Sequence, residues 1–220
     1  MMTPEEVLQE IAEQTRVCTR CNLHHSRKNA VPGVGNPRSD VLFIGEGPGF
    51  HENEQGLPFV GAAGTFLDEL LGVAGLTREG VFITNVVKCR PPGNRDPQSE
   101  ELDACKTYLE RQIAVINPDV IVTLGRVSMG LFVNNGKISA IHGRKFWSHG
   151  RMVIPMYHPA AALHQPSLRS VVKEDFAKLP DMLTEAQSAR YVAPDLDETN
   201  QGIQVEYPTD ENDAEQLSLF

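Results

Sequence analysis

The sequence predicts an α/β fold, namely a three-layer α/β/α sandwich around a four-stranded parallel sheet, followed by a disordered acidic C-terminal tail. Short apolar runs of strand length alternate along the chain with longer segments of helical periodicity. Such alternation is typical of parallel strands joined by right-handed crossover helices that cover both faces of the sheet. The 220 residues, 40% of them hydrophobic, suffice for one sizeable core.

The expected elements follow in order from the amino terminus. Residues 4–16 have apolar positions at helical spacing and Thr3 as a candidate N-cap, which predicts a short amphipathic helix. Strands are expected at residues 40–44, 81–87, 119–124 and 152–157. Further helices are expected at residues 62–74, 99–116, 125–133 and 167–187, with a loop and hairpin at 134–151.

The first strand leads into the stretch that we expect to form one wall of a pocket. It ends in the turn Gly45-Glu46-Gly47-Pro48-Gly49, whose glycines allow backbone to approach a ligand closely. An aromatic residue, Phe59, follows on a loop. Ligands bind outside the carboxyl ends of parallel strands. At that position the turn offers backbone amides and the Glu46 carboxylate, and the loop offers the Phe59 ring. The turn is not a phosphate loop, since GxxxxGK[ST] is absent; an ordinary glycine-rich loop is the alternative.

The formal net charge of −9 is concentrated near the C-terminus. Residues 185–220 contain nine acidic residues and one base, whereas the preceding 184 residues contain 20 acidic and 19 basic residues. A nearly neutral body can present a basic face to DNA, so the total charge does not exclude nucleic acid. No apolar run reaches the ~18 residues of a membrane helix, and the acidic N-terminal segment is unlike a secretory signal. We expect a cytoplasmic monomer without membrane contact.

The four cysteines suggest a metal centre. Cys18 and Cys21 form a CxxC pair after the first helix, Cys89 follows the second strand, and Cys105 is placed on the next helix. Four thiolates suit zinc or an iron–sulfur cluster, and the wide second pair favours a [4Fe-4S] cluster. The alternatives are unrelated buried cysteines or a CxxC dithiol. Disulfides are not expected in a cytoplasmic chain.

Together, four motifs resemble those of the family 4 uracil-DNA glycosylases. They are GEGPG at 45–49, GLPFVGAAG at 56–64, TNVVKCRPPGNRDP at 84–97 and YHPAA at 157–161, framed by the four cysteines. The resemblance covers about residues 4–183. It implies a four-stranded parallel sheet between helical layers, a [4Fe-4S] cluster on the cysteines, and hydrolysis of the bond between uracil and deoxyribose that leaves an abasic site and starts base-excision repair.

Within this resemblance, the residues expected to bind uracil suit a base flipped out of DNA. Phe59 can stack on the ring. The amide of Asn85 offers a donor and an acceptor that match uracil O4 and N3–H, whereas cytosine presents the reverse pattern. His158 can donate to uracil O2 and stabilise the charge on the leaving base, and the backbone amides of residues 45–49 can bind the other carbonyl edge. A loop-capping Asn and a structural His are the alternatives.

The group that acts on the attacking water is less evident. Other branches of the superfamily carry an Asp where this chain has Gly47, so Glu46 is the only carboxylate in the motif. We assign Glu46 to uracil contact or to positioning of the water. If bond breaking is largely dissociative, with an oxocarbenium-like sugar, a strong base is not required.

Two further segments are expected to bind partners. Residues 134–151 are basic and resemble the loop that enters the DNA, with candidate phosphate contacts at Lys137, His142, Arg144 and Lys145; a solvated hairpin is the alternative. At the C-terminus, QLSLF resembles the peptide by which bacterial DNA enzymes dock on the replication sliding clamp, with candidate contacts Gln216, Leu217, Leu219 and Phe220.

The expected organisation is therefore a glycosylase domain at residues 1–187, a disordered acidic linker at 188–215, and a clamp-binding peptide at 216–220. The alternative functions are a covalent or non-catalytic uracil-DNA-binding protein and an electron-transfer module that uses the cluster. Covalent binding through an inserted His is disfavoured because CRPPGNRDP contains no His. An electron carrier would need no pocket of the kind formed by Glu46, Phe59, Asn85 and His158.

Overall fold

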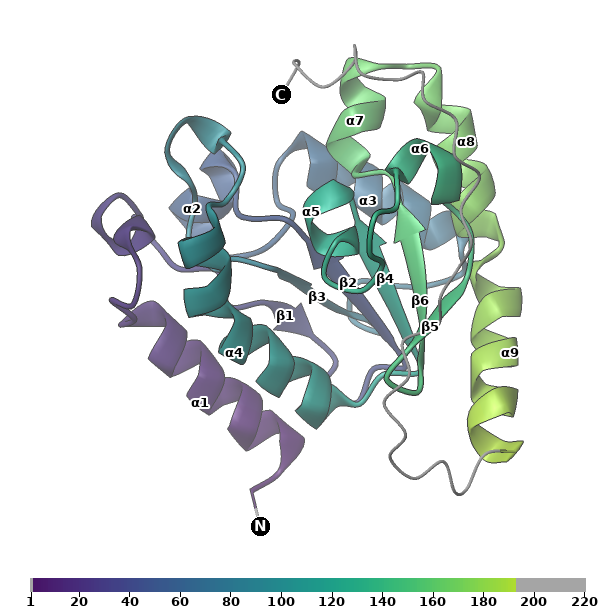
Figure 1. Cartoon of the computed structure of the whole chain (residues 1–220), viewed down its shortest axis with the longest axis horizontal. Coiled ribbons are helices and arrows are strands. Elements are labelled where there is room, and N and C mark those ends of the chain that lie inside the picture. The colour runs from purple at the N-terminus through teal and green to yellow at the C-terminus, as the bar shows by residue number, and fades with distance from the viewer. Residues whose placement is uncertain (1, 193–220) are drawn as a thin grey trace.

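A twisted six-stranded sheet forms the centre of the protein, with strand order β1-β3-β2-β4-β6-β5 (Figure 1). The computed structural model describes residues 2–192; the expected clamp-binding peptide and most of the expected linker lie outside the described residues. The strands are β1 (Val34–Gly35), β2 (Val41–Gly45), β3 (Phe82–Asn85), β4 (Val120–Leu124), β5 (Phe146–Ser148) and β6 (Arg151–Met156).

The four inner strands, β3, β2, β4 and β6, are parallel to one another, as predicted. The prediction of four strands in total was wrong, because β1 and β5 add an antiparallel strand at each edge. β1 has two residues, one of them a glycine, and is too short to give an alternating pattern. β5 belongs to the hairpin expected in residues 134–151, where sequence alone does not distinguish a paired edge strand from a loop.

Helices cover both faces of the sheet. The helices of the described region are α1 (Pro4–Arg16), α2 (Phe50–Gln55), α3 (Ala62–Val73), α4 (Ser99–Ile116), α5 (Arg126–Met129), α6 (Ile138–Ile141), α7 (Pro159–His164), α8 (Leu168–Ala177) and α9 (Leu179–Val192), with 3₁₀ turns η1 (Asn22–His25) and η2 (Pro92–Asn94). α1 and α4 pack on one face, and α3, α7, α8 and α9 pack on the other (Figure 1).

Several helices differ from the prediction. The helix expected at 167–187 is two helices, α8 and α9, with Lys178 ending the first. Pro180 explains the break, because proline is tolerated in the first turn of a helix but not in its interior. The polar stretch after Gly49 is helical in α2, and α7 starts directly after His158; both have six residues and are too short to show a clear period.

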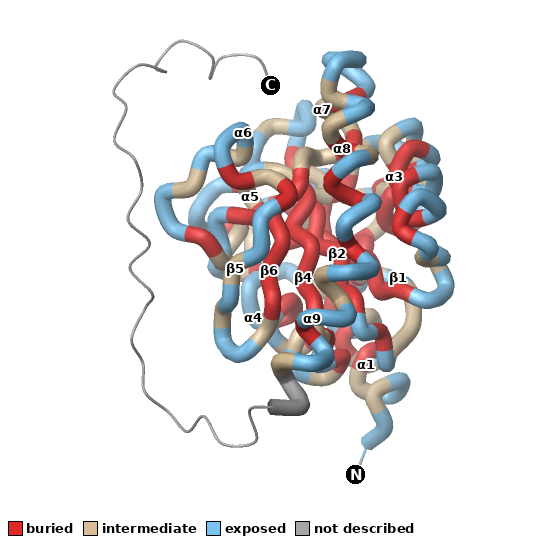
Figure 2. Tube along the Cα trace, turned by 90° about the vertical axis from the view of Figure 1, so that its right-hand side faces the viewer, coloured by how far each residue is buried: buried red, intermediate tan, exposed pale blue. Residues whose placement is uncertain are grey.

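The core consists of two apolar layers, one on each face of the sheet. In Figure 2 the central strands are buried along their length, while the exposed residues lie on the outer surfaces of the helices and in the loops. α1 begins with a capping box in which the Thr3 hydroxyl accepts from the Glu6 N–H and the Glu6 carboxylate accepts from the Thr3 N–H. No helix among residues 2–192 has the length and apolar character that a membrane crossing requires.

Candidate active site

The site forms where the four parallel strands end at the same edge of the sheet. Gly45 is the last residue of β2, and Asn85 is the last residue of β3. Gly125 follows β4, and His158 lies two residues beyond β6. Open α/β sheets bind ligands at this edge. The fold therefore brings together residues that are more than 100 positions apart in the sequence.

Phe59, Asn85 and His158 converge over Gly45. The Phe59 and His158 rings are 5.5 Å apart between centroids and nearly parallel, at 27°. A Cβ added at Gly45 would lie 2.3 Å from Asn85 Oδ1 and 2.8 Å from the Phe59 ring, closer than van der Waals contact allows. Gly45 is therefore required for these two side chains to approach the strand end. Three of the residues expected to bind uracil form one constellation.

Asn85 is buried, and its Oδ1 atom has no hydrogen-bond partner among the described residues. A buried amide oxygen without a partner is costly, by about 1–3 kcal/mol. Unsatisfied polar groups of this kind point to a ligand that completes the hydrogen bonding. The backbone beyond Asn85 is fixed to the glycine-rich turn, because the Val86 N–H donates to Gly45 O and the Val87 N–H donates to Glu46 O.

His158 is held in a defined orientation and protonation state. Its Nδ1 atom accepts a hydrogen bond from the Ala160 N–H at 3.1 Å, so the neutral ring carries its proton on Nε2. Burial lowers the pKa of His158 to about 4, and the negative charge of Glu52 only partly opposes this shift. At neutral pH His158 is an uncharged N–H donor at the strand edge.

Glu46 follows Gly45 and is partly buried. Burial raises the pKa of its carboxyl group, and the charge of Asp96 raises it further, whereas Arg126 opposes the shift. Asp96 and Arg126 also form an ion pair with each other. Glu46 is thus a carboxylate with raised proton affinity near the pocket, which suits contact with a water or with a polar edge of the base.

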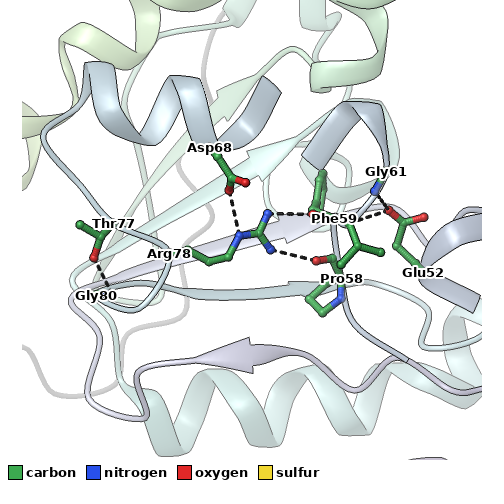
Figure 3. Close-up of polar contacts among 9 residues, drawn as sticks. Glu52, Pro58, Phe59, Gly61, Asp68, Thr77, Arg78 and Gly80 are labelled. Atoms are coloured by element: carbon green, nitrogen blue, oxygen red, sulfur yellow. Dashed lines mark hydrogen bonds and ion pairs between the residues drawn. The ribbon is translucent and has the colours of Figure 1, made fainter. Parts of the chain in front are cut away.

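Phe59 has a backbone conformation that aromatic residues rarely adopt, with φ of 52°. Arg78 holds this conformation from one side of the loop, since its guanidinium donates to Pro58 O at 3.1 Å and Phe59 O at 2.7 Å, and to the Asp68 carboxylate at 2.8 Å (Figure 3). Gly64 is equally necessary, because a Cβ there would lie 1.8 Å from Phe59 O. Backbone strain at such a position is typical of functional sites.

Glu52 supports the same loop from the other side. Its Oε1 atom accepts from the Val60 N–H at 2.9 Å and the Gly61 N–H at 3.1 Å (Figure 3). Neither Glu52 nor Arg78 could be recognised as a site residue from the sequence. Neither belongs to a spacing pattern with a chemical meaning; only the tertiary contacts with Phe59 and its neighbours reveal their role.

Replacing Arg78 by glutamine is expected to lower the free energy of unfolding by about 2 kcal/mol, because two carbonyl groups lose their charged donor. It should also weaken ligand binding at this site, since Phe59 is then free to leave its strained conformation. Urea denaturation and a ligand titration measure the two effects. Arg38→Gln is a matched control, because Arg38 pairs with Glu5 on the surface and should contribute no more than about 0.5 kcal/mol. Equal stability of the two variants would contradict the role of Arg78.

The four cysteines, all free thiols, line one cavity between α1, the Cys18–Cys21 segment and the start of α4. Cys89 and Cys105 are buried, and Cys18 and Cys21 are partly exposed. No group of three or more His, Cys, Asp or Glu side chains within residues 2–192 is already spaced to hold a metal ion. The donor set nevertheless suits a thiolate-bound centre, because four sulfur ligands face one space.

Two N–H donors reach sulfur atoms in this cavity. Arg27 Nη1 donates to Cys89 Sγ, and the Lys88 N–H donates to Cys105 Sγ, both at 3.3 Å. Burial raises the pKa of Cys89, with Arg27 opposing, and raises the pKa of Cys105 to about 11, with Lys88 opposing. Hydrogen bonds of this type stabilise metal-bound thiolates.

Lys88 links the cysteine cavity to the base pocket. Its side chain is fully buried, and its Nζ atom donates to Thr84 Oγ1, Asn85 O and Gln112 Oε1, each at 2.7 Å. Burial lowers the pKa of Lys88 to about 8. The sequence does not indicate this role, because Lys side chains are almost never fully buried unless they are paired.

Four residues are expected to contact DNA, namely Lys137, His142, Arg144 and Lys145. Two of them have side chains that already contact a carboxylate within the protein. His142 Nδ1 is 2.6 Å from the buried carboxylate of Asp175, and Lys145 Nζ is 2.6 Å from the Glu185 carboxylate. Both pairs attach the loop to α8 and α9. Lys137, at the start of α6, and Arg144 are exposed, which leaves these two best placed for a phosphate.

The fold and the constellation of Phe59, Asn85 and His158 define an α/β protein with a candidate site at the carboxyl edge of its parallel strands. Residues 32–182 match the family model described as the Uracil DNA glycosylase superfamily. Among curated proteins, the chain is 46% identical to the Type-4 uracil-DNA glycosylase of Sulfurisphaera tokodaii over 185 residues, covering 80% of this chain and 84% of that protein. It is 47% identical to the Type-4 uracil-DNA glycosylase of Thermotoga maritima over 183 residues, covering 81% and 95%.

A Type-5 uracil-DNA glycosylase from Thermus thermophilus is less similar, at 35% identity over 150 residues that cover 58% of this chain and 68% of that protein. The matches to these Type-4 proteins cover about four-fifths of the chain. The chain therefore belongs to the uracil DNA glycosylase superfamily, in its type-4 group.

Proposed function

We propose that this protein hydrolyses the N-glycosidic bond of uracil in DNA, releases uracil and leaves an abasic site, which starts base-excision repair. The observation that carries the proposal is the buried Asn85 amide with an unpartnered Oδ1 atom among the described residues, beside Phe59 and the Nε2–H donor of His158. Membership in the type-4 group supports the same substrate.

In the proposed reaction, the flipped uracil stacks on Phe59. Asn85 pairs with the O4 and N3–H edge of the base, and the Nε2–H of His158 donates to O2. As the glycosidic bond breaks, negative charge develops on the base, and these donors stabilise it more than they stabilise the substrate. Glu46 contacts the base or positions the water that attacks the sugar. Backbone N–H groups of residues 45–49 complete the polar lining.

The direct test is cleavage of an oligonucleotide with a single uracil, followed by alkali to break the strand at abasic sites. We expect strand breaks only at the uracil, and none in the same oligonucleotide with thymine or cytosine at that position. Tight binding to the uracil strand without any break would replace the proposed hydrolase with a non-catalytic uracil-DNA-binding protein.

We propose further that Cys18, Cys21, Cys89 and Cys105 hold a [4Fe-4S] cluster. Support comes from the shared cavity, the two N–H donors to sulfur and the resemblance to iron–sulfur glycosylases. When bound, the cluster would supply a cross-link rather than a reactant, because it would join the segment after α1 to β3 and α4. Arg27 strengthens the same junction by donating to Cys18 O and Arg16 O.

Replacing Cys105 by serine is expected to abolish the visible absorbance of the cluster and to lower the melting temperature, because one ligand and the cross-link are lost. Iron and acid-labile sulfide analysis of the purified protein measures the loading directly. The control is Thr107→Ser, an exposed position on the same helix, which should leave both quantities unchanged. Stoichiometric zinc without iron in the wild type would reject the iron–sulfur assignment in favour of a zinc centre.

The remaining assignments extend this proposal. Lys137 and Arg144 contact phosphates of the substrate, and His142 and Lys145 do so only when their pairs with Asp175 and Glu185 open. The protein acts as a monomer in the cytoplasm, where its cysteines stay reduced. Residues 1–187 form the glycosylase domain and residues 188–215 the linker, whose first five residues continue α9.

The last five residues dock on the replication sliding clamp, with Leu217, Leu219 and Phe220 in an apolar groove and Gln216 fixing the register. A long linker raises the concentration of the enzyme near newly made DNA. Deletion of residues 216–220 should abolish clamp binding and leave excision from short oligonucleotides intact. Equal clamp affinity with and without these residues would reject the docking site.

A further inference from the structure

We propose that Phe50 and Arg90 form a stacking site for an unpaired nucleobase of the substrate strand, next to the flipped uracil. The inference rests on the proposed function and adds a second contact that binds the strand without reading its sequence. It assigns a role to an aromatic residue that the uracil pocket itself does not use.

Phe50 is an exposed aromatic residue that does not belong to the hydrophobic core. Its side chain is 54% exposed in the first turn of α2, although Asn53 of the same helix is buried. The Arg90 guanidinium lies over its ring, 5.4 Å from the centroid. The His51 ring meets it edge-on, at 5.4 Å and 82°. An exposed aromatic ring with a cation and an imidazole as neighbours is well suited to a nucleobase, which has a flat π surface and a nearby phosphate.

The position of α2 places this pair at the edge of the uracil pocket. Two residues beyond Phe50, the Glu52 carboxylate binds the Val60 and Gly61 N–H groups directly after Phe59. His51 also contacts this segment, since its Cδ2 atom would lie 3.3 Å from a Cβ placed on Gly61. The helix that carries Phe50 is thus fixed to the loop that carries the ring on which uracil stacks.

Arg90 reaches Phe50 from the second wall of the pocket. It follows β3 by five residues, and its Nε atom donates to Asn94 Oδ1 at 2.8 Å, which fixes the guanidinium. The next residue, Pro91, lies over the glycine-rich turn, with its Cδ 3.6 Å from a Cβ placed on Gly47. Phe50 and Arg90 therefore come from the two segments that supply Glu46 and Asn85. A DNA strand that places a base in the uracil pocket would pass beside Phe50 and Arg90.

The occupant that fits best is a nucleobase of the same strand rather than an apolar protein segment. The site is continuous with the base pocket, and Arg90 supplies the positive charge that a phosphodiester neighbour requires. Stacking on an aromatic side chain tolerates any base, so the site would add affinity for unpaired DNA without adding specificity. Duplex DNA would use it less, because its flanking bases remain stacked on each other.

The test uses single-stranded oligonucleotides with 2-aminopurine, a base whose fluorescence is quenched by stacking, on the 5′ or 3′ side of the target. The target is 2′-fluoro-2′-deoxyuridine, because the fluorine opposes an oxocarbenium-like sugar and so blocks cleavage. We expect wild-type protein to quench 2-aminopurine on one of the two sides. Phe50→Ala should remove the quenching and weaken binding on the order of 10-fold, whereas Phe50→Tyr should retain both.

Trp147→Ala is the matched control, because Trp147 is an exposed aromatic residue, 41% accessible, on edge strand β5; it should behave as the wild type. Unchanged quenching and affinity in Phe50→Ala would overturn the proposal. Wild-type quenching and affinity in Phe50→Leu would also overturn the proposal, because they would indicate an apolar contact without stacking. Excision from duplex DNA by the wild type is measured in parallel, so that failure of the stacking site is distinguished from failure of the proposed glycosylase activity.

Discussion

Replacing Asn85 by alanine is expected to slow uracil excision by about 10²- to 10³-fold under single-turnover conditions, because a desolvated base loses both hydrogen bonds from the amide. The Oδ1 atom of Asn85 is buried without a partner in the described part of the chain. Its removal should therefore cost the folded protein little stability, and a thermal melt should show an unchanged or slightly raised midpoint.

Asn85→Asp sharpens this test, because it keeps the shape of the side chain but replaces the N–H donor by an acceptor. The carboxylate would repel uracil O4, so excision should remain at least as slow as in Asn85→Ala. Thr123→Ala serves as the control, since Thr123 is another buried polar residue whose hydroxyl has no partner among the described residues. Excision by Asn85→Asp at the wild-type rate would contradict the assigned pairing.

Replacing His158 by alanine is expected to lower the rate of bond cleavage by about 10²- to 10³-fold, because the donor that faces the developing negative charge is lost. Single-turnover measurements at saturating enzyme separate this effect from binding. His158→Asn, which can still donate a hydrogen bond, should be less impaired than His158→Ala. Equal rates for the alanine variant and the wild type would remove His158 from the mechanism.

The lowered pKa of His158 also predicts how stability depends on pH. The neutral ring is favoured in the folded protein, where its pKa is about 4, whereas the unfolded chain has the ordinary value of about 6.5. The unfolded state therefore binds the proton first. The contribution to stability is complete above about pH 6.5 and is lost as the pH falls towards 4. Between pH 7 and 5 the wild type should lose about 2 kcal/mol more than His158→Gln, measured by urea denaturation.

Much of the site could be predicted from the sequence because its residues stand at the ends of apolar runs. In parallel strands all carboxyl ends meet at one edge, so Glu46, Asn85 and His158 could be placed together before any coordinates. The four cysteines could likewise be proposed as one metal site, because Cys18 and Cys21 form a CxxC pair and four thiolates suit a metal centre. The residues of β2, β4 and β6 are buried on both faces and give the continuous apolar runs that indicate inner parallel strands.

Other features depend on contacts between segments that carry no pattern of their own. Arg78 and Glu52 hold the Phe59 loop through backbone groups, and a hydrogen bond to a carbonyl or an N–H leaves no trace in the spacing of residues. The contacts that occupy His142 and Lys145 involve α8 and α9, more than 30 positions away. The sequence alone therefore overestimates how many basic side chains of this loop are available to contact phosphates.

The sequence by itself determined the fold class and the inner strands, because periodicity is a local property of the chain. Its motifs also predicted the cysteine set and the residues proposed to read the base. Only the tertiary structure decided the two edge strands and the division of the last helix. It also decided the hydrogen bonds that hold the Phe59 loop and the exposure of Phe50 beside Arg90. These depend on which segments pack together, and packing joins residues whose separation along the chain has no regular period.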